Sequence, residues 1–397
     1  MTKRFLFCPL ASHGYVYPMV GIALALRRLG HDVAFVTGPG FEKTLRAAEI
    51  KRIPRGNHDG PSFEAELWWE PLAVAVQVKH IEHALALFGP DVLVGHQLTR
   101  GPLIVAERQG LPVAVLGFST YLWPDGQLPG QSAQSDRESR LVWRFGDMLD
   151  SYNKVRDLCA LPPDPGEYAS TGMLGDLFML QGVPEFEPDI DRLPARVHLV
   201  GACVWEPPHA DDALARWLNS SGPSDAPLLY VQHGRLFHLP SFWPHLVNSL
   251  EHQPIRVAAA IGRMDGEVGR VPETWFVRDH LSQGAVLPKA AAVISAANTT
   301  SVLGALLHGV PSLLIPGGGE QPDVAERCVA IGTSVSLDPH EVNDVALTQA
   351  IGNLLHNDQL RARAKAMQVC FARWPGCERS AALLACLAST QSPVLRS

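Results

Sequence analysis

Residues 3–39 read KRFLFCPLASHGYVYPMVGIALALRRLGHDVAFVTGP, and this stretch decides the fold class. The apolar run at 3–12 ends at small residues, the stretch 18–30 has the pattern of an amphipathic helix, and 31–39 is a second apolar run closed by Gly-Pro. The order is strand, helix, strand. Because the alternation returns at 90–119 with buried β-branched runs, the first half is predicted to be α/β, with a parallel sheet covered on both faces.

The second half repeats this pattern beyond residue 227, in PLLYVQHG at 227–234, PIRVAAAIG at 254–262 and AAAVISAANTTSVLGALLHGVPSLLIP at 290–316. The stretch before it is rich in Pro, Ser, Gly and Asp, as is typical of a linker. Two doubly wound units would face each other with the carboxyl ends of their strands lining a shared cleft. We therefore predict an N-terminal Rossmann-like domain at 1–205, a linker at 206–227, a C-terminal Rossmann-like domain at 228–375, and a last helix at 376–397 that could pack back on the first domain.

The composition narrows the class of ligand. A chain of 397 residues exceeds one ordinary core, so two domains of about 200 residues are expected. A net charge of −7 gives no basic field for nucleic acid, and no apolar run is long enough for a transmembrane segment. The apolar run after the basic pair near the N-terminus is too short for a signal sequence, so secretion is not expected, and seven scattered cysteines suggest neither disulfides nor zinc. We expect a cytoplasmic protein with small-molecule ligands, and a homodimer is left open.

The most specific segment lies at 278–327 and contains LLHGVPSLLIP at 306–316 and GEQPDVAER at 319–327. It resembles the donor-binding signature of the family 1 glycosyltransferases of the GT-B fold, the macrolide and natural-product type, and the resemblance covers essentially the whole chain. It implies an inverting, metal-independent transfer of a hexose from UDP or TDP to a small natural-product acceptor in antibiotic biosynthesis. It also implies a nucleotide sugar as co-substrate and no further cofactor.

The resemblance implies a set of donor-binding residues. The strand AAAVIS at 290–295 runs into a helix whose N-terminus suits a diphosphate. Side chains there either cap the helix or donate to phosphate oxygens. Arg235 either supplies a positive charge to the diphosphate or is an exposed surface residue. The residues are Gly234 and Arg235 for phosphate, His280 and Gln283 for the nucleoside, Asn298, Thr299, Thr300 and Ser301 at the helix start, and Glu320 and Gln321 for sugar hydroxyls.

The catalytic positions depart from the family pattern. The family reads H-G-H-V-N-P, and here Tyr15 in HGYVYP replaces the histidine that acts as base, while His96 in PDVLVGH replaces its aspartate partner. The phosphate-binding histidine is also missing from the segment 295–298. A tyrosine is a poor base at neutral pH, whereas histidine titrates near 6.5.

Two arrangements of the base stay open. In one, His96 acts with Tyr15 as a hydrogen-bonded relay, and we expect these two side chains to lie close together. In the other, His13 turns into the cleft and takes the role of its neighbour. A third interpretation is that His13 and His96 are ordinary loop histidines of a fold that no longer transfers sugar. Such a protein would bind or modify a biosynthetic intermediate, or would serve as a non-catalytic auxiliary subunit.

Rigid aromatic side chains cluster in segments that match nothing in the family. They are candidates for an apolar acceptor pocket, and core packing explains them equally well. These residues are Trp68, Trp69, Tyr121, Trp123 and Trp143. Asp189 and Asp191 have the D-x-D spacing of metal-dependent sugar transferases, but they lie in a Pro-rich stretch and are predicted to be solvated charges. We therefore predict no metal site.

Overall fold

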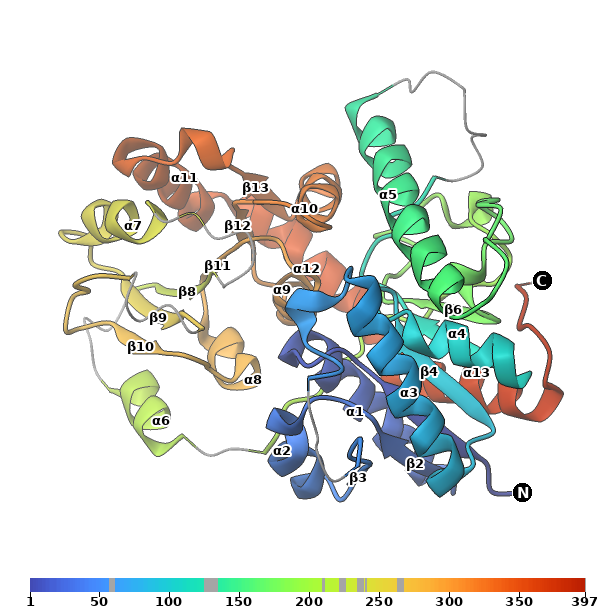
Figure 1. The fold of residues 1–397 in the computed structure, drawn as a ribbon. Helices are drawn as coiled ribbons and strands as arrows, with labels where there is room; N and C mark the ends of the chain where they lie inside the picture. Colours follow the sequence, from blue (N-terminus) through green and yellow to red (C-terminus); the bar gives the residue numbers. More distant parts are fainter. Residues whose placement is uncertain are drawn as a thin grey trace. The chain divides into compact units, whose positions relative to one another are not determined.

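The computed structural model describes residues 1–56, 61–124, 135–208, 211–220, 226–233, 239, 241–262 and 268–396. The chain divides into two compact units, the first made of Met1–Pro207 with Trp374–Ser397 and the second of Pro208–Arg373. The chain leaves the first unit once and returns to it for its last helix, coloured red at the end of the sequence in Figure 1. Each unit contains its own parallel sheet and its own core.

The sheet of the first unit has seven strands in the order β3-β2-β1-β4-β5-β6-β7, all parallel. Along β1, Leu6 and Cys8 belong to one hydrophobic cluster and Phe5 and Phe7 to another, so both faces of the sheet are buried. The strands are β1 (Arg4–Cys8), β2 (Asp32–Phe35), β3 (Lys51–Arg52), β4 (Val92–His96), β5 (Val113–Leu116), β6 (Leu177–Leu180) and β7 (Val197–Leu199).

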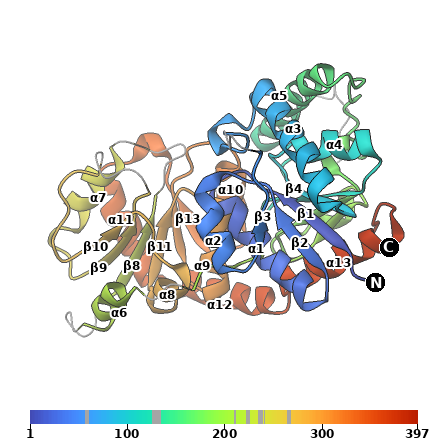
Figure 2. The same cartoon turned by 60° about the horizontal axis from the view of Figure 1, so that its bottom comes forward.

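Helices cover both faces of this sheet. Helices α3, α4 and α5 pack on one face, and α1 pairs with α13 on the opposite face (Figure 2). Their ends follow local sequence, since Ser135 caps α5 by accepting from the N–H of Glu138, and Gly110 ends α4 at φ 63°. The helices are α1 (His13–Arg28), α2 (Glu42–Ala47), α3 (Pro71–Phe88), α4 (Gly101–Gln109), α5 (Asp136–Leu158) and α13 (Gly376–Thr390).

The second unit is built in the same way around the strand order β10-β9-β8-β11-β12-β13, again all parallel. Its strands are β8 (Leu228–Gln232), β9 (Arg256–Ala260), β10 (Phe276–Arg278), β11 (Ala292–Ser295), β12 (Ser312–Leu314) and β13 (Ser334–Ser336). Helices α7, α11 and α12 contribute to one core cluster, and α6, α8 and α9 to the other. The α/β fold class predicted from the sequence is confirmed.

The helices of the second unit are α6 (Asp212–Asn219), α7 (Phe242–Leu250), α8 (Gln283–Val286), α9 (Thr299–His308), α10 (Gln321–Ala330), α11 (Asp344–His356) and α12 (Asp358–Ala372). Short 3-10 helices occur in both units, namely η1 (Pro39–Phe41), η2 (Ala65–Leu67), η3 (Gly172–Leu174), η4 (Ile190–Arg192), η5 (Leu287–Lys289) and η6 (Pro339–Glu341).

The segment 206–227, which the sequence predicts to be a linker, contains helix α6. Leu214 and Leu218 of α6 are buried in the same cluster as Tyr230 of β8, and the Asp211 carboxylate caps the helix. This corrects the sequence-based expectation. A composition rich in Pro, Ser, Gly and Asp surrounds an amphipathic helix that is part of the second unit.

The last helix, α13, packs against α1 in the first unit. The chain approaches it through a close crossing of two backbones, where a Cβ on Gly201 would collide with the carbonyl oxygen of Trp374 and one on Gly376 with that of Ala202. Gly201 also has φ +88°, a left-handed conformation that glycine adopts without strain. The glycines therefore allow the returning chain to join the first unit.

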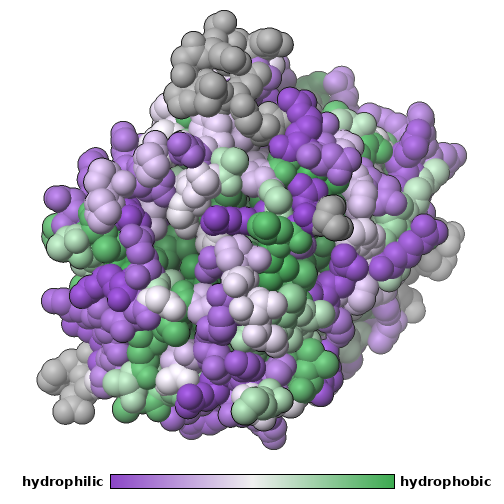
Figure 3. Space-filling model, turned by 90° about the vertical axis from the view of Figure 1, so that its right-hand side faces the viewer, coloured by the Kyte–Doolittle hydropathy of each residue, from purple (hydrophilic) through white to green (hydrophobic). Residues whose placement is uncertain are grey.

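The surface mixes polar and apolar residues. On the face drawn in Figure 3, hydrophobic residues form patches bordered by hydrophilic ones. Among the exposed apolar side chains are Trp69 and Trp143, with 53% and 71% of their surface exposed. Within the described residues, no helix is both long enough and apolar enough to cross a bilayer.

Candidate active site

In the first sheet, the order in which the chain adds strands reverses between β1 and β4. The chain adds β2 and β3 on one side of β1 and then crosses over to add β4 on the other side. These two strands pair in parallel, so their carboxyl ends meet at one edge. Helix α1 begins with His13 shortly after β1, and His96 is the last residue of β4. Open α/β sheets bind ligands at such a switch point. The predicted catalytic residues therefore lie at the edge that topology favours.

Tyr15 and His96 are in contact, with ring centroids 4.3 Å apart and planes inclined by 43°. This confirms the expectation that the two side chains meet. His96 also packs edge-on against Phe118 at 4.9 Å, and its Nδ1 accepts a hydrogen bond from the N–H of Leu98 at 3.3 Å. A neutral imidazole whose Nδ1 accepts carries its proton on Nε2. The geometry therefore holds His96 as a neutral ring between aromatic neighbours.

Burial makes His96 a weak base. The side chain is 2% exposed, and desolvation of the charged form lowers its pKa to about 3. Compared with a histidine at its ordinary pKa near 6.5, its attraction for a proton is weaker by about 5 kcal/mol. The structure thus counts against His96 as the proton acceptor, which was one of the two arrangements left open by the sequence.

His13 has a different environment. It is the first residue of α1 and is exposed, with its ring edge-on to Tyr17 at 5.0 Å and to Phe41 at 5.3 Å. Protonation of an exposed imidazole does not require burial of a charge. Of the two histidines near the switch point, His13 is therefore the exposed one and His96 the buried one.

In the second sheet, the strand order reverses between β8 and β11. These two strands end opposite each other at Gln232 and Ser295. Gly234 and Arg235 follow β8 but lie outside the described residues. Gln283, the first residue of α8, donates a hydrogen bond from Nε2 to Oε1 of Gln232 at 3.0 Å. The structure therefore brings one predicted nucleoside residue to the switch point, with its amide bound to a strand-end side chain.

Asn298 caps the N-terminus of α9. Oδ1 of Asn298 accepts from the N–H of Ser301 and from the hydroxyl of Thr300, both at 3.0 Å, while the Ser301 hydroxyl donates to the carbonyl oxygen of Asn298 at 3.0 Å. Thr299 and Ser301 are 6% and 2% exposed, and Thr300 is half-buried. Because the first N–H groups of a helix have no carbonyl partner within it, the backbone at this end remains suited to an anion.

The predicted sugar-binding pair follows β12. Gln321 is 4% exposed, and its Oε1 accepts from the N–H groups of Gly317 at 2.8 Å and Gly318 at 3.3 Å. This holds the glycine turn and leaves the amide nitrogen of Gln321 as a donor. Glu320 is half-buried at the N-cap of α10, whereas His280, predicted to contact the nucleoside, is exposed after β10.

The aromatic candidates for the acceptor pocket separate into three groups. Tyr121 and Trp123 are 3% and 1% exposed and pack in the core of the first unit, the alternative that the sequence left open. This corrects their assignment to an acceptor surface. Trp69 and Trp143 are exposed. Trp68 is half-buried beside a cation, with the guanidinium carbon of Arg100 at 5.2 Å from its ring centroid.

Sequence analysis missed a buried polar loop between β4 and α4. Gln97, Thr99 and Arg100 are 7%, 1% and 2% exposed. The amide nitrogen and oxygen of Gln97 and the hydroxyl oxygen of Thr99 have no hydrogen-bond partner. Polar loop residues are normally solvated, and burial cannot be read from QLTR alone. The available signal was their position, directly after a buried strand that ends at His96.

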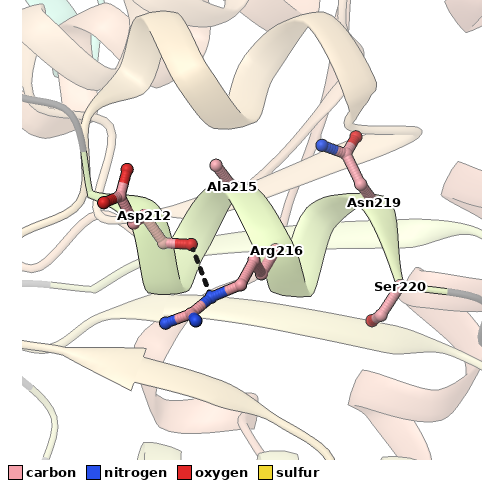
Figure 4. Close-up of a pocket in the computed structure, with 5 residues that line it drawn as sticks. All are labelled: Asp212, Ala215, Arg216, Asn219 and Ser220. Carbon is pink, nitrogen blue, oxygen red and sulfur yellow. Dashed lines mark hydrogen bonds between the residues drawn. The ribbon is translucent and has the colours of Figure 1, made fainter.

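A depression along α6 is separate from these residues. Figure 4 shows its lining side chains, with a hydrogen bond of 3.2 Å from Nε of Arg216 to the carbonyl oxygen of Asp212. The lining residues are Asp212, Ala215, Arg216, Asn219 and Ser220. None of the predicted site residues is among them.

Comparison with known proteins identifies relatives of the whole chain. Residues 253–377 match the family model of the erythromycin biosynthesis protein CIII-like C-terminal domain. The NDP-glycosyltransferase YjiC of Bacillus subtilis (strain 168) is 30% identical over 393 residues, covering 94% of each chain. The 4'-demethylrebeccamycin synthase of Lentzea aerocolonigenes is 26% identical over 409 residues, covering 92% of this chain and 94% of its own.

A solved structure agrees in fold. The glycotransferase of kitacinnamycin superposes with a TM-score of 0.76 at 19% identity, covering 99% of this chain and 100% of its own. Both sequence relatives extend over the two units, and the Bacillus subtilis relative is named as a glycosyltransferase. The chain therefore belongs to the family 1 glycosyltransferases of the GT-B fold, the natural-product type.

Proposed function

We propose that this glycosyltransferase moves a hexose from UDP or TDP to a small natural-product acceptor, with inversion at the anomeric carbon and without a metal or cofactor. The observation that carries the proposal is the switch point of the second sheet. There β11 runs into α9, whose N-terminus is organised by the Asn298 cap, and β8 ends beside it at Gln232. A helix N-terminus at such an edge suits a diphosphate leaving group.

In an inverting transfer, the acceptor oxygen attacks the anomeric carbon opposite the departing diphosphate. Backbone N–H groups at the start of α9 stabilise the negative charge that develops on the diphosphate. The amide nitrogen of Gln321 and the carboxylate of Glu320 bind sugar hydroxyls. Gln321 already uses its Oε1 to hold the glycine turn, so its proposed contact to sugar is donation from Nε2.

His13 is our candidate for the base that activates the acceptor hydroxyl. It is exposed at the switch point of the first sheet, whereas burial lowers the pKa of His96 to about 3. His96 instead positions Tyr15, through the ring contact at 4.3 Å. With these roles, the positive charge forms on the exposed His13 and the buried His96 stays neutral.

Binding and product analysis test the proposal. Thermal shift and calorimetry with UDP, TDP and their glucose conjugates measure donor binding, because a ligand of the folded state raises its stability by mass action. Proton NMR of the product formed from an α-linked donor reports the configuration of the new bond, and EDTA tests metal dependence. A β-linked product that forms equally well in EDTA is expected. Failure of every nucleotide to bind would instead support a repurposed fold that acts on an intermediate without sugar transfer.

A further inference from the structure

The loop between β4 and α4 is unusual because it is both polar and buried. Connecting loops run over the surface of most proteins, where water satisfies their polar groups. Here Gln97, Thr99 and Arg100 are all more than nine-tenths buried. Neither the amide of Gln97 nor the hydroxyl of Thr99 has a hydrogen-bond partner. Each such group costs about 1–3 kcal/mol of stability, so its presence calls for an explanation outside folding.

Arg100 carries the main charge of this loop. Its Nη1 donates to the hydroxyl of Ser151 on α5 at 2.9 Å, and its guanidinium lies beside the ring of Trp68. Burial lowers its pKa to about 10, with Tyr152 and Asp147 opposing the shift, so the group stays protonated at neutral pH. A guanidinium has five N–H donors, and one of them is used here.

No carboxylate in the described part of the chain forms an ion pair with Arg100. The contrast with Arg156 on α5 is informative, because that buried guanidinium holds both carboxylate oxygens of Glu107, at 2.6 and 2.9 Å. A buried cation without such a partner is costly. The fold therefore contains, next to the half-buried Trp68, a buried guanidinium that has no ion-pair partner and only the more distant charge of Asp147 to oppose its burial.

The position of this loop connects it to the site. It starts directly after His96, at the switch point of the first sheet, and it ends at the N-terminus of α4, for which Arg100 is the N-cap. The positive end of a nine-residue helix adds to the charge of the guanidinium. Since the donor diphosphate is expected in the second unit, an anion bound here belongs to the acceptor.

We propose that Arg100, with Thr99 and Gln97, binds a carboxylate group of the acceptor, and that Trp68 packs on the flat ring bearing it. The planar guanidinium pairs with a planar carboxylate through two parallel hydrogen bonds, which favours this anion over a single-point contact. The inference rests on the proposed function in taking the ligand to be the acceptor. It adds the chemical class, an aromatic acid with a separate hydroxyl group.

The test uses three probes that differ in one group, namely 6-hydroxy-2-naphthoic acid, its methyl ester and 2-naphthol. Binding is measured by calorimetry without a sugar nucleotide. The variants are Arg100→Met, which keeps a long apolar side chain beside Trp68, and Arg100→Lys, which keeps the charge but not the fork. The matched control is Arg108→Met on the same helix, whose guanidinium is partly exposed and pairs with Glu82 at 3.0 Å.

The acid is expected to bind the unmodified protein at least tenfold more tightly than the ester or 2-naphthol. Arg100→Met abolishes this preference, Arg100→Lys keeps part of it, and Arg108→Met keeps all of it. Because Arg100→Met replaces a buried charge without an ion-pair partner by an apolar side chain, its Tm is expected to stay unchanged or to rise.

Several outcomes overturn the proposal. These are equal binding of acid and ester by the unmodified protein, binding of none of the probes at millimolar concentration, and an acid preference that survives in Arg100→Met. A folded Arg100→Met protein with a lowered Tm and an unchanged preference would show a purely structural arginine. Binding of UDP and TDP is measured in parallel. If neither nucleotide binds but the preference for the acid is present, the proposed function is wrong and the carboxylate site is still supported.

Discussion

The buried neutral state of His96 predicts a specific loss of stability in acid, which the variant His96→Asn removes. In the unfolded chain a histidine binds a proton near pH 6.5, whereas the folded pKa of His96 is about 3. Between these values the unfolded state binds more protons than the folded state, so stability falls as the pH decreases from 6.5 towards 3. Above pH 6.5, His96 is neutral in both states and causes no such loss of stability.

The expected size follows from the two pKa values. Between pH 7 and pH 4.5 this single group lowers the free energy of unfolding by about 2–3 kcal/mol. Asparagine does not titrate, and its amide oxygen is able to accept from the N–H of Leu98, as Nδ1 of His96 does at 3.3 Å. His80, whose burial lowers its pKa to about 4, adds an acid sensitivity that is common to both proteins.

Urea denaturation at pH 7 and at pH 4.5 measures the effect as a difference of differences. On acidification, the free energy of unfolding of the unmodified protein should fall by about 2–3 kcal/mol more than that of His96→Asn. Substitution of the exposed His252 by asparagine serves as the control and should leave the loss as in the unmodified protein. An equal loss in His96→Asn and in the unmodified protein would show that His96 is not buried as a neutral ring.

Three further predictions concern turnover, donor binding and packing. His13→Ala should lower kcat by about 10²–10⁴, measured by nucleotide release, and full activity in this variant would exclude it as the base. Gln321→Glu keeps an acceptor for the glycine turn but loses the amide donor. Calorimetry should therefore show a larger loss of affinity for the sugar nucleotide than for the bare nucleotide diphosphate, and equal losses would contradict the proposed contact of Gln321 with the sugar. A Cβ at Gly376 collides with the backbone carbonyl oxygen of Ala202, so Gly376→Ala should cost about 1–3 kcal/mol in urea denaturation. Gly352→Ala, where a Cβ meets nothing within 4 Å, should show no such loss.

The sequence predicts the α/β class because its strands have a distinctive composition. Segments such as β4 and β11 are short, apolar and β-branched, which is typical of strands buried on both faces. The edge at which Tyr15 and His96 meet was predictable for the same reason, since parallel strands end on one side of a sheet. Local patterns and a topological rule were sufficient for these features.

Burial of individual side chains was not predictable in this way. Tyr121 and Trp123 lie after a strand in a segment without clear periodicity, where an aromatic residue has the same appearance in a pocket and in a core. Helix α6 was hidden because Asp, Ser and Pro at its flanks favour both linkers and helix caps. Arg100 looked like a solvated loop residue, since its environment is made by Trp68 and Ser151 from distant segments.

The altered catalytic pair is best understood through the energetics of charge. A histidine base gains a positive charge during catalysis, and the buried position of His96 opposes that charge, since its pKa is about 3. Replacing the family's acidic partner by His96 removes the negative charge that would stabilise a protonated base nearby. Tyr15 and His96 together therefore form a neutral pair of rings in tilted contact. Proton transfer is favoured where water solvates the charge, and His13, exposed on the first turn of α1, meets that condition.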